Sequence, residues 1–202
     1  MHITRDKIKW TLWINQSIYI KWVIEFLSIS SCSSTKTSMH HKCQLKKNVY
    51  QKSEQWIKYQ AIFEEIENYQ SIIEILMWVI CQTWSDIVYA VSKCSRYLMN
   101  SIFNHDLTVK QIIQYLINTA ELRLWYEFFR KKRVERAKFF EYIDSAHVNY
   151  LNSWRFIFNY MFFLWNELIS WSFKHQQCVS MSFIEAEYID EYNAIKKLIF
   201  LI

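Results

Sequence analysis

The sequence predicts an α+β protein, with helices in its first two thirds and a strand-rich last third that ends in a helix. Apolar residues recur at helical spacing over 69–99, where they indicate two helices separated near residues 82–85, and again over 108–118. A last helix is expected from Phe183 onward. Between these helices, short apolar segments bounded by turn-forming residues are typical of strands, and they stand at 138–143, 158–164 and 169–173.

The start of the chain carries one further strand and one further helix. The segment WTLWI at 10–14 predicts a strand, and apolar residues three and four apart predict a helix over 16–27. Residues 28–55 are rich in Ser, Thr, Lys and His and lack periodicity, so they predict a linker. These patterns divide the chain into the segments 1–55, 56–137 and 138–202.

The composition is unusual because the 202 residues include no glycine and no proline. Ordinary usage would place roughly 14 glycines and 10 prolines in a chain of this length. Turns and helix ends depend on these two residue types for their backbone conformations. Replacement in a degenerating gene explains the absence better than design, since the chain also keeps five cysteines and ten tryptophans.

Charge and cysteine usage exclude few functions. The formal net charge of +5 is compatible with a nucleic-acid partner and also with none. The five cysteines are odd in number and lack paired spacing, so they indicate neither a disulfide framework nor a zinc ribbon. The charged N-terminus and the lack of a long uncharged apolar stretch predict no signal peptide and no transmembrane segment, and hence an intracellular protein, in a cytoplasmic particle or the nucleus.

A run of basic residues lies between the helical region and the strands. Such a run can contact phosphate groups, and it can equally be a solvated connector. We keep both interpretations open for its members, Arg130, Lys131, Lys132, Arg133, Arg136 and Lys138.

Two acidic residues of the last third could act together. Asp144 stands at the end of the predicted strand at 138–143, and Glu187 lies within the last helix. Carboxylates from a strand and a packed helix can share Mg²⁺ ions, which stabilise the attacking and leaving oxygens in phosphodiester cleavage. Most acid pairs in a chain of this size are simply solvated, so the spacing alone is a weak signal.

Several motifs occur in the same order in one known family. ISWS at 169–172 and SFIEAEY at 182–188 follow the strand EYIDSAH, which contains Asp144. Upstream stand SDIVYAVS at 85–92 and QYLINTAELRLWY at 114–126. Further back, INQSIYIKWVIEF is accompanied by SSTKTSM. From about residue 10 onward, this set resembles the Pol polyprotein of copia-type LTR retrotransposons, between the end of the reverse transcriptase and the first half of RNase H.

The resemblance implies a domain order and a site. Segment 1–55 corresponds to the end of the reverse transcriptase, 56–137 to a helical thumb and connection region, and 138–202 to a truncated RNase H-like mixed sheet with one packed helix. Asp144 and Glu187 match the first two metal-binding carboxylates of RNase H, which uses Mg²⁺ to cleave the RNA of RNA–DNA hybrids. The implied partners are such hybrids and the remainder of the Pol polyprotein.

The resemblance also implies that the site is incomplete. The remaining RNase H acids fall in family segments beyond Ile202, and no Tyr-x-Asp-Asp polymerase motif occurs in the chain. We therefore expect an inactive fragment. Two alternatives are a domesticated nucleic-acid-binding module that uses the basic run, and a nuclease subunit completed by another chain.

The departures from the family pattern suggest how glycine and proline were lost. Family glycines correspond to Arg123, Asn159 and Glu167, and a family Arg-Pro corresponds to Trp84-Ser85. These changes are reachable by C-to-T transitions on one or other DNA strand, which deplete GGN and CCN codons. We therefore interpret the chain as a transition-mutated, pseudogene-like copy, and we expect it to fold marginally because bulky residues such as Phe156 and Phe158 replace smaller ones.

Overall fold

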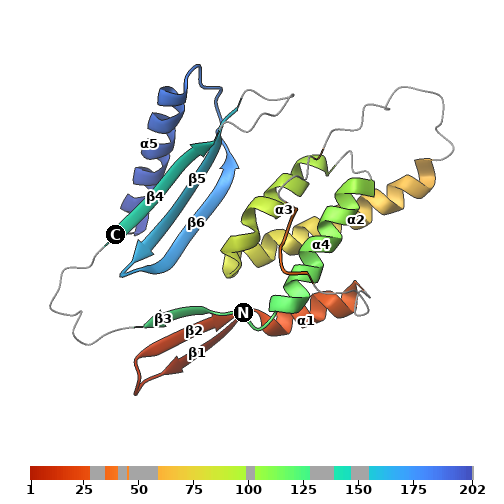
Figure 1. Cartoon of the computed structure of the whole chain (residues 1–202), viewed down its shortest axis with the longest axis horizontal. Helices are drawn as coiled ribbons and strands as arrows, with labels where there is room; N and C mark the ends of the chain where they lie inside the picture. Colours follow the sequence, from red (N-terminus) through yellow and green to blue (C-terminus); the bar gives the residue numbers. More distant parts are fainter. Residues whose placement is uncertain are drawn as a thin grey trace. The chain divides into compact units, whose positions relative to one another are not determined.

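The computed structural model describes residues 1–27, 35–40, 45, 59–98, 103–127, 139–146 and 155–201. These residues combine helices with two three-stranded sheets, which confirms the predicted α+β class. The chain divides into two compact units, Met1–Trp125 and Tyr126–Ile202 (Figure 1). Among the described helices, none is long and apolar enough to cross a membrane.

The first unit begins with a hairpin and continues mainly as helices. Its sheet has the strand order β1-β2-β3, so the chain passes through the whole helical region before β3 pairs with β2. Its elements are β1 (His2–Asp6), β2 (Thr11–Asn15), α1 (Ser17–Phe26), α2 (Tyr59–Gln82), a 3₁₀ turn (Ser85–Ile87), α3 (Val88–Cys94), a second 3₁₀ turn (Ser95–Tyr97), α4 (Phe103–Thr119) and the first half of β3 (Leu124–Glu127).

Helices α2, α3 and α4 share the core of the first unit. Leu76 of α2, Val91 of α3 and Ile112 of α4 are completely buried, and each such side chain contributes about 1.5–3 kcal/mol of hydrophobic stabilisation. The hydroxyl of Tyr69 donates to the carbonyl of Cys94 at 2.9 Å, which joins α2 to the end of α3. Each of these helices buries one face in this core, and the apolar residues of that face produce the periodicity from which the helices were predicted.

The predicted interruption after α2 is confirmed. The Thr83 hydroxyl donates to the side-chain carbonyl of Gln16 at 2.7 Å. Trp84 leaves the helical conformation, with φ −108° and ψ 68°, and its buried ring meets Tyr115 edge-on at a centroid distance of 6.3 Å. A polar contact and an aromatic contact thus hold the chain where it turns from α2 towards α3.

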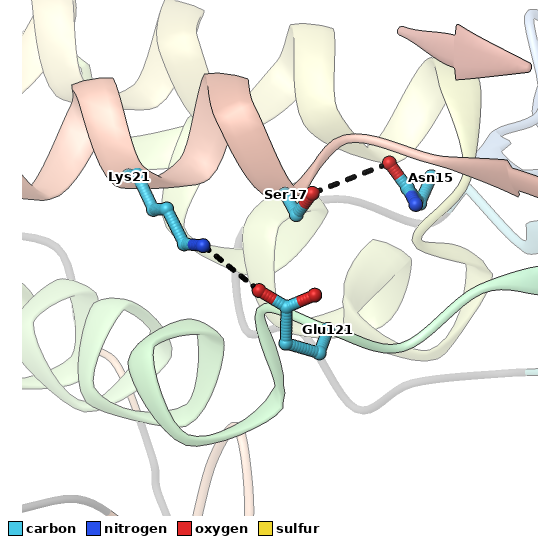
Figure 2. A network of polar contacts seen from close by, with 4 residues as sticks. All are labelled: Asn15, Ser17, Lys21 and Glu121. Atoms are coloured by element: carbon cyan, nitrogen blue, oxygen red, sulfur yellow. Dashed lines mark hydrogen bonds and ion pairs between the residues drawn. The ribbon is translucent and has the colours of Figure 1, made fainter.

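Helix α1 follows β2 and packs on α4. Its buried side includes Ile20, and the Ser17 hydroxyl donates to the side-chain carbonyl of Asn15 at 3.3 Å. Figure 2 shows this contact beside the ion pair between Lys21 Nζ and Glu121 Oε1, which are 3.0 Å apart. Because both ion-pair side chains are more than 60% exposed, the pair contributes less than about 1 kcal/mol, and apolar burial dominates.

Strand β1 is an element that the sequence patterns do not predict. It pairs antiparallel with β2, and four of its five residues are exposed, so it lacks the apolar alternation of a half-buried strand. The hairpin turn is held by Asp6, whose Oδ1 accepts hydrogen bonds from the backbone N–H groups of Ile8 (2.8 Å) and Lys9 (3.0 Å). These bonds, that from Lys9 first, hold the pKa of Asp6 below its usual value.

The second unit consists of an antiparallel sheet and one helix. The strands are β4 (Phe139–Ala146), β5 (Ile157–Leu164) and β6 (Glu167–His175), in the order β4-β5-β6. Helix α5 (Phe183–Leu201) lies alongside β4 (Figure 1). The three strands and the helix expected from the sequence are confirmed.

Aromatic side chains form the core between this sheet and α5. Phe158, Tyr160 and Phe162 project from β5 and pack with Ala194 of α5. The centroid distances along this row are 5.3 Å between Phe158 and Tyr160 and 4.8 Å between Tyr160 and Phe162. Phe156 is buried and meets Phe183 edge-on. Large rings therefore fill this core, with a small alanine opposite them.

Three residues in the described part of the chain adopt the left-handed backbone conformation. They are Trp10 (φ 56°), Trp165 (φ 51°) and Asn166 (φ 69°). This conformation costs a residue with a Cβ atom about 1–2 kcal/mol, and glycine avoids the cost. The residues at positions where the resemblance places family glycines, Arg123, Asn159 and Glu167, are not among the three. The positions with a left-handed backbone are therefore different from those positions.

The β5–β6 turn supplies a stability prediction. Trp165 and Asn166 are the two residues between the paired positions Leu164 and Glu167, and a two-residue hairpin loop with positive φ at both positions favours Asn-Gly. We expect the double change Trp165→Asn/Asn166→Gly to stabilise the second unit by about 1 kcal/mol. Amide hydrogen exchange of β5 and β6, measured by mass spectrometry, should report slower opening.

Trp165→Ala is the matched control for this turn. It removes the indole ring but leaves a Cβ atom in the left-handed conformation, so it separates ring contacts from backbone strain. If the double variant opened as fast as Trp165→Ala, backbone strain would not be the quantity that limits this hairpin.

Candidate acidic site on strand β4 and helix α5

Asp144 lies near the C-terminal end of β4 and is exposed. It pairs in register with Asn159 of β5, while its neighbour Ile143 packs against the aromatic core. Because successive side chains of a strand point to opposite faces, the Asp144 carboxylate points away from that core. Its position is thus fixed by the strand, and its carboxylate is solvated.

Glu187 lies in the second turn of α5 and is also exposed. It is followed three residues later by Asp190 and preceded by Ala186, both of which are completely buried. Within the described residues, no ion pair or hydrogen bond joins Glu187 to Asp144. The two residues predicted to hold a metal ion are therefore carried by adjacent elements, but both face solvent.

The motif at the start of α5 has a structural role. The hydroxyl of Ser182 accepts a hydrogen bond from the backbone N–H of Glu185 at 3.1 Å, and Glu185 Oε2 accepts one from the backbone N–H of Met181 at 2.7 Å. This reciprocal arrangement resembles a capping box, which satisfies N–H groups at a helix start. The Ser-x-x-Glu part of the motif thus determines where α5 begins, and Ala186 lets the helix approach its neighbours closely.

Asp190 is the acid that the sequence analysis missed. Its carboxylate is completely buried, and its Oδ1 accepts a hydrogen bond from Gln176 Nε2 at 2.6 Å. The same amide nitrogen donates to the carbonyl of Ala186 at 2.8 Å, and the Ser180 hydroxyl donates to Gln176 Oε1 at 2.8 Å. Gln176 therefore joins the end of β6 to two turns of α5.

Burial raises the pKa of the Asp190 carboxyl to about 6. Loss of hydration is the largest cause, the hydrogen bond from Gln176 opposes it, and the negative charge of Asp144 adds to it. The second oxygen, Oδ2, is buried without a hydrogen-bond partner. Asp144 thus interacts electrostatically with Asp190, an acid on the inner side of α5.

The helical spacing of α5 contains a signal from which the burial of Asp190 could have been predicted. Residues 186, 190 and 194 stand four apart, which places them on one side of a helix. Two of them are alanines, and small residues mark a face that packs closely. A lone acid between two such alanines predicts a buried carboxyl.

This arrangement does not match a two-metal centre. Such a centre needs several oxygen ligands converging on ions about 3.5–4 Å apart. Among the described residues, no group of three or more His, Cys, Asp or Glu side chains could hold a metal ion. The predicted nucleic-acid contacts at 130, 131, 132, 133 and 136 lie outside the described residues.

The buried carboxyl predicts how stability depends on pH. The native pKa of Asp190 is about 6, above the ordinary value of 3.8, so the native state binds a proton more tightly than the unfolded chain. This contribution to stability is present below about pH 4 and is lost as pH rises through about 6, with a total loss of up to about 3 kcal/mol.

Asp190→Asn tests this assignment, because an amide keeps the acceptor for Gln176 but cannot ionise. We expect the variant to be more stable than the wild type at pH 7.5 and similar to it near pH 4, as measured by hydrogen exchange of α5 at several pH values. Asp144→Asn should have a smaller effect in the same direction. Equal pH profiles for the wild type and Asp190→Asn would show that this carboxyl does not titrate in the folded protein.

Three curated proteins are similar to the chain, whereas no family model and no solved structure matches it. A secreted RxLR effector protein of Plasmopara viticola is 26% identical over 133 residues, which are 66% of this chain and 90% of that protein. A retrovirus-related Pol polyprotein from transposon TNT 1-94 of Nicotiana tabacum is 27% identical over 201 residues, which are 100% of this chain and 14% of the polyprotein. The chain is therefore similar over its whole length to a short part of a retrotransposon Pol polyprotein.

Proposed function

We propose that the chain is a fragment of a copia-type Pol polyprotein, spanning the end of the reverse transcriptase and the first half of RNase H, and that it is inactive in hybrid cleavage. The similarity to the tobacco polyprotein over the whole chain supports the polyprotein origin. The order of the motifs around Asp144 and Glu187 supports the finer placement. Hybrid cleavage is then the ancestral activity, with Mg²⁺ as the ancestral cofactor.

The observation that carries this proposal is the relation of α5 to β4. The strand with Asp144 and the helix with the Ser-x-x-Glu-Ala-Glu-Tyr motif pack against each other, although about 40 residues separate the two acids. A site that takes one carboxylate from each element requires this neighbourhood. The packing of α5 on β4 supports the proposed ancestry, whereas the Asp144 side chain on the face of β4 away from α5 supports the loss of the site.

Loss of activity follows from the acids themselves. Asp144 and Glu187 are solvated, and the third acid, Asp190, accepts a hydrogen bond from Gln176 inside the unit. Two hydrated carboxylates bind Mg²⁺ weakly and leave the positions of two ions undefined. The chain alone therefore lacks the charge stabilisation that phosphodiester cleavage requires.

Incubation of the purified chain with a labelled RNA–DNA hybrid and Mg²⁺ tests the inactivity. We expect no cleavage above the level of the Asp144→Asn variant, with an active RNase H as a positive control. Cleavage by the wild type that is lost in Asp144→Asn would contradict the proposal and favour a working nuclease. Addition of a second Pol segment extends the test to a subunit that another chain completes.

A second candidate is a separate module without catalytic activity. The Plasmopara viticola protein supports this candidate, because about nine tenths of its length is similar to two thirds of this chain. A comparable stretch can thus make up most of a separate protein. Nucleic-acid binding through the basic run is the function we would assign to such a module.

Salt dependence tests the binding module. Each phosphate contact adds nearly one unit to the slope of the logarithm of the binding constant against the logarithm of the salt concentration. We expect Arg130→Gln/Lys131→Gln/Lys132→Gln to reduce that slope by about 3 in fluorescence anisotropy with a labelled hybrid. Replacement of Lys7, Lys9 and Lys36 by Gln provides a control with the same loss of charge. Lack of binding by the wild type at low salt would exclude the module.

A further inference from the structure

The outer side of α5 carries an uncovered row of large apolar residues. The members are four, four, three and four positions apart, so they follow one side of the helix. They lie opposite the buried Ala186, Asp190 and Ala194. We call these residues the α5 stripe, and they are Ile184 (66% exposed), Tyr188 (69%), Tyr192 (66%), Ile195 (42%) and Ile199 (72%).

A shallow, open groove lies along the first half of the stripe. Its volume is about 470 Å³, and it lies along the N-terminal turns of α5. Its lining residues are Ser182, Ile184, Glu185, Tyr188, Ile189 and Tyr192. A branched aliphatic side chain fits such a groove as a knob fits the hole between four residues of a facing helix.

The charges of α5 are divided between its two halves. Glu185, Glu187, Asp190 and Glu191 lie in the first half, and Lys196 and Lys197 in the second. Glu185 and Lys196 are eleven residues apart, which is about three helical turns, so both flank the stripe on the same side. A twofold axis perpendicular to the helix brings the same side of two antiparallel helices together and reverses their direction.

We propose that two copies of this chain associate through the α5 stripe, with their α5 helices antiparallel. Ile195 and Ile199 of each copy enter the groove at the N-terminal half of α5 in the other copy. Glu185 of each copy then faces Lys196 of the other, which forms two equivalent ion pairs. The antiparallel arrangement also places opposite ends of the two helix dipoles together.

Two features limit the affinity. A stable complex buries about 800 Å² per partner, and a single helix face provides less, so we expect a dissociation constant of about 10–100 µM. Glu191 flanks the stripe on the other side, where it faces Glu191 of the second copy. Glu191→Gln should therefore tighten the dimer about twofold to fivefold by removing this repulsion.

Sedimentation velocity of the full chain, from about 5 to about 200 µM, tests the proposal. The wild type should change from monomer to dimer across this range. Ile195→Glu should remain monomeric, because it places a charge at the centre of the apolar contact. Ile8→Glu is the matched control, since Ile8 is 92% exposed in the first unit, and it should dimerise like the wild type.

The antiparallel register of the two α5 helices has a test of its own. Lys196→Glu places two acids opposite each other and should weaken the dimer about fivefold to tenfold. Adding Glu185→Gln should restore much of the affinity, and it keeps the helix cap because glutamine can replace glutamate there. Lys110→Glu, on the exposed side of α4, makes the same charge change elsewhere and should have no effect.

The proposal fails if the wild type is monomeric throughout the range, or if Ile195→Glu dimerises as the wild type does. Assemblies larger than dimers that persist in Ile195→Glu would place the contact on another surface. Loss of affinity in Lys196→Glu without recovery in the double variant would exclude the antiparallel register. Far-UV circular dichroism of each variant ensures that a change in association is not a loss of folding.

Discussion

The contact between α5 and the β4-β5-β6 sheet determines most of what the second unit can do. Aromatic rings of β5 meet Ala194 of α5, and Gln176 adds hydrogen bonds to two turns of the helix. This contact fixes which side of α5 is buried. It therefore decides that Asp190 lies inside and Glu187 outside, and that the α5 stripe faces solvent. The proposed ancestral site and the proposed dimer both follow from one orientation of a helix.

Periodicity predicted the elements that have one buried side. Helices α1 to α5 and strand β5 bury apolar residues on one side. These elements, together with β2, β4 and β6, correspond to segments expected from the sequence. Strand β1 has no such face, and β3 has only four residues, so neither produces a pattern. Asp190 was missed because the signal for its burial lies in the alanines four residues before and after it, and the charge pattern alone does not contain that signal. The left-handed conformations of Trp10 and Trp165 were equally hidden, since composition shows that glycine is absent but not which turns require it.

A core and a metal site differ in how much change of sequence they tolerate. Phe156 and Phe158 are buried against other rings, so the core of the second unit is apolar and aromatic. Cores tolerate apolar replacements when total volume and pattern are preserved. A metal site tolerates much less, because each ligand must keep both its type and its position. A sequence under relaxed selection can therefore lose catalytic geometry while its strands and helices persist.

The strand order of the first unit has a consequence for how the chain folds. Strand β3 joins β2 although about 110 residues lie between them, and helices α1 to α4 occupy that interval. Contacts between residues far apart in sequence form slowly, because the intervening chain must lose conformational entropy first. The strands of the second unit pair with near neighbours along the chain. The β4–β5 and β5–β6 pairs can therefore form before β3 pairs with β2.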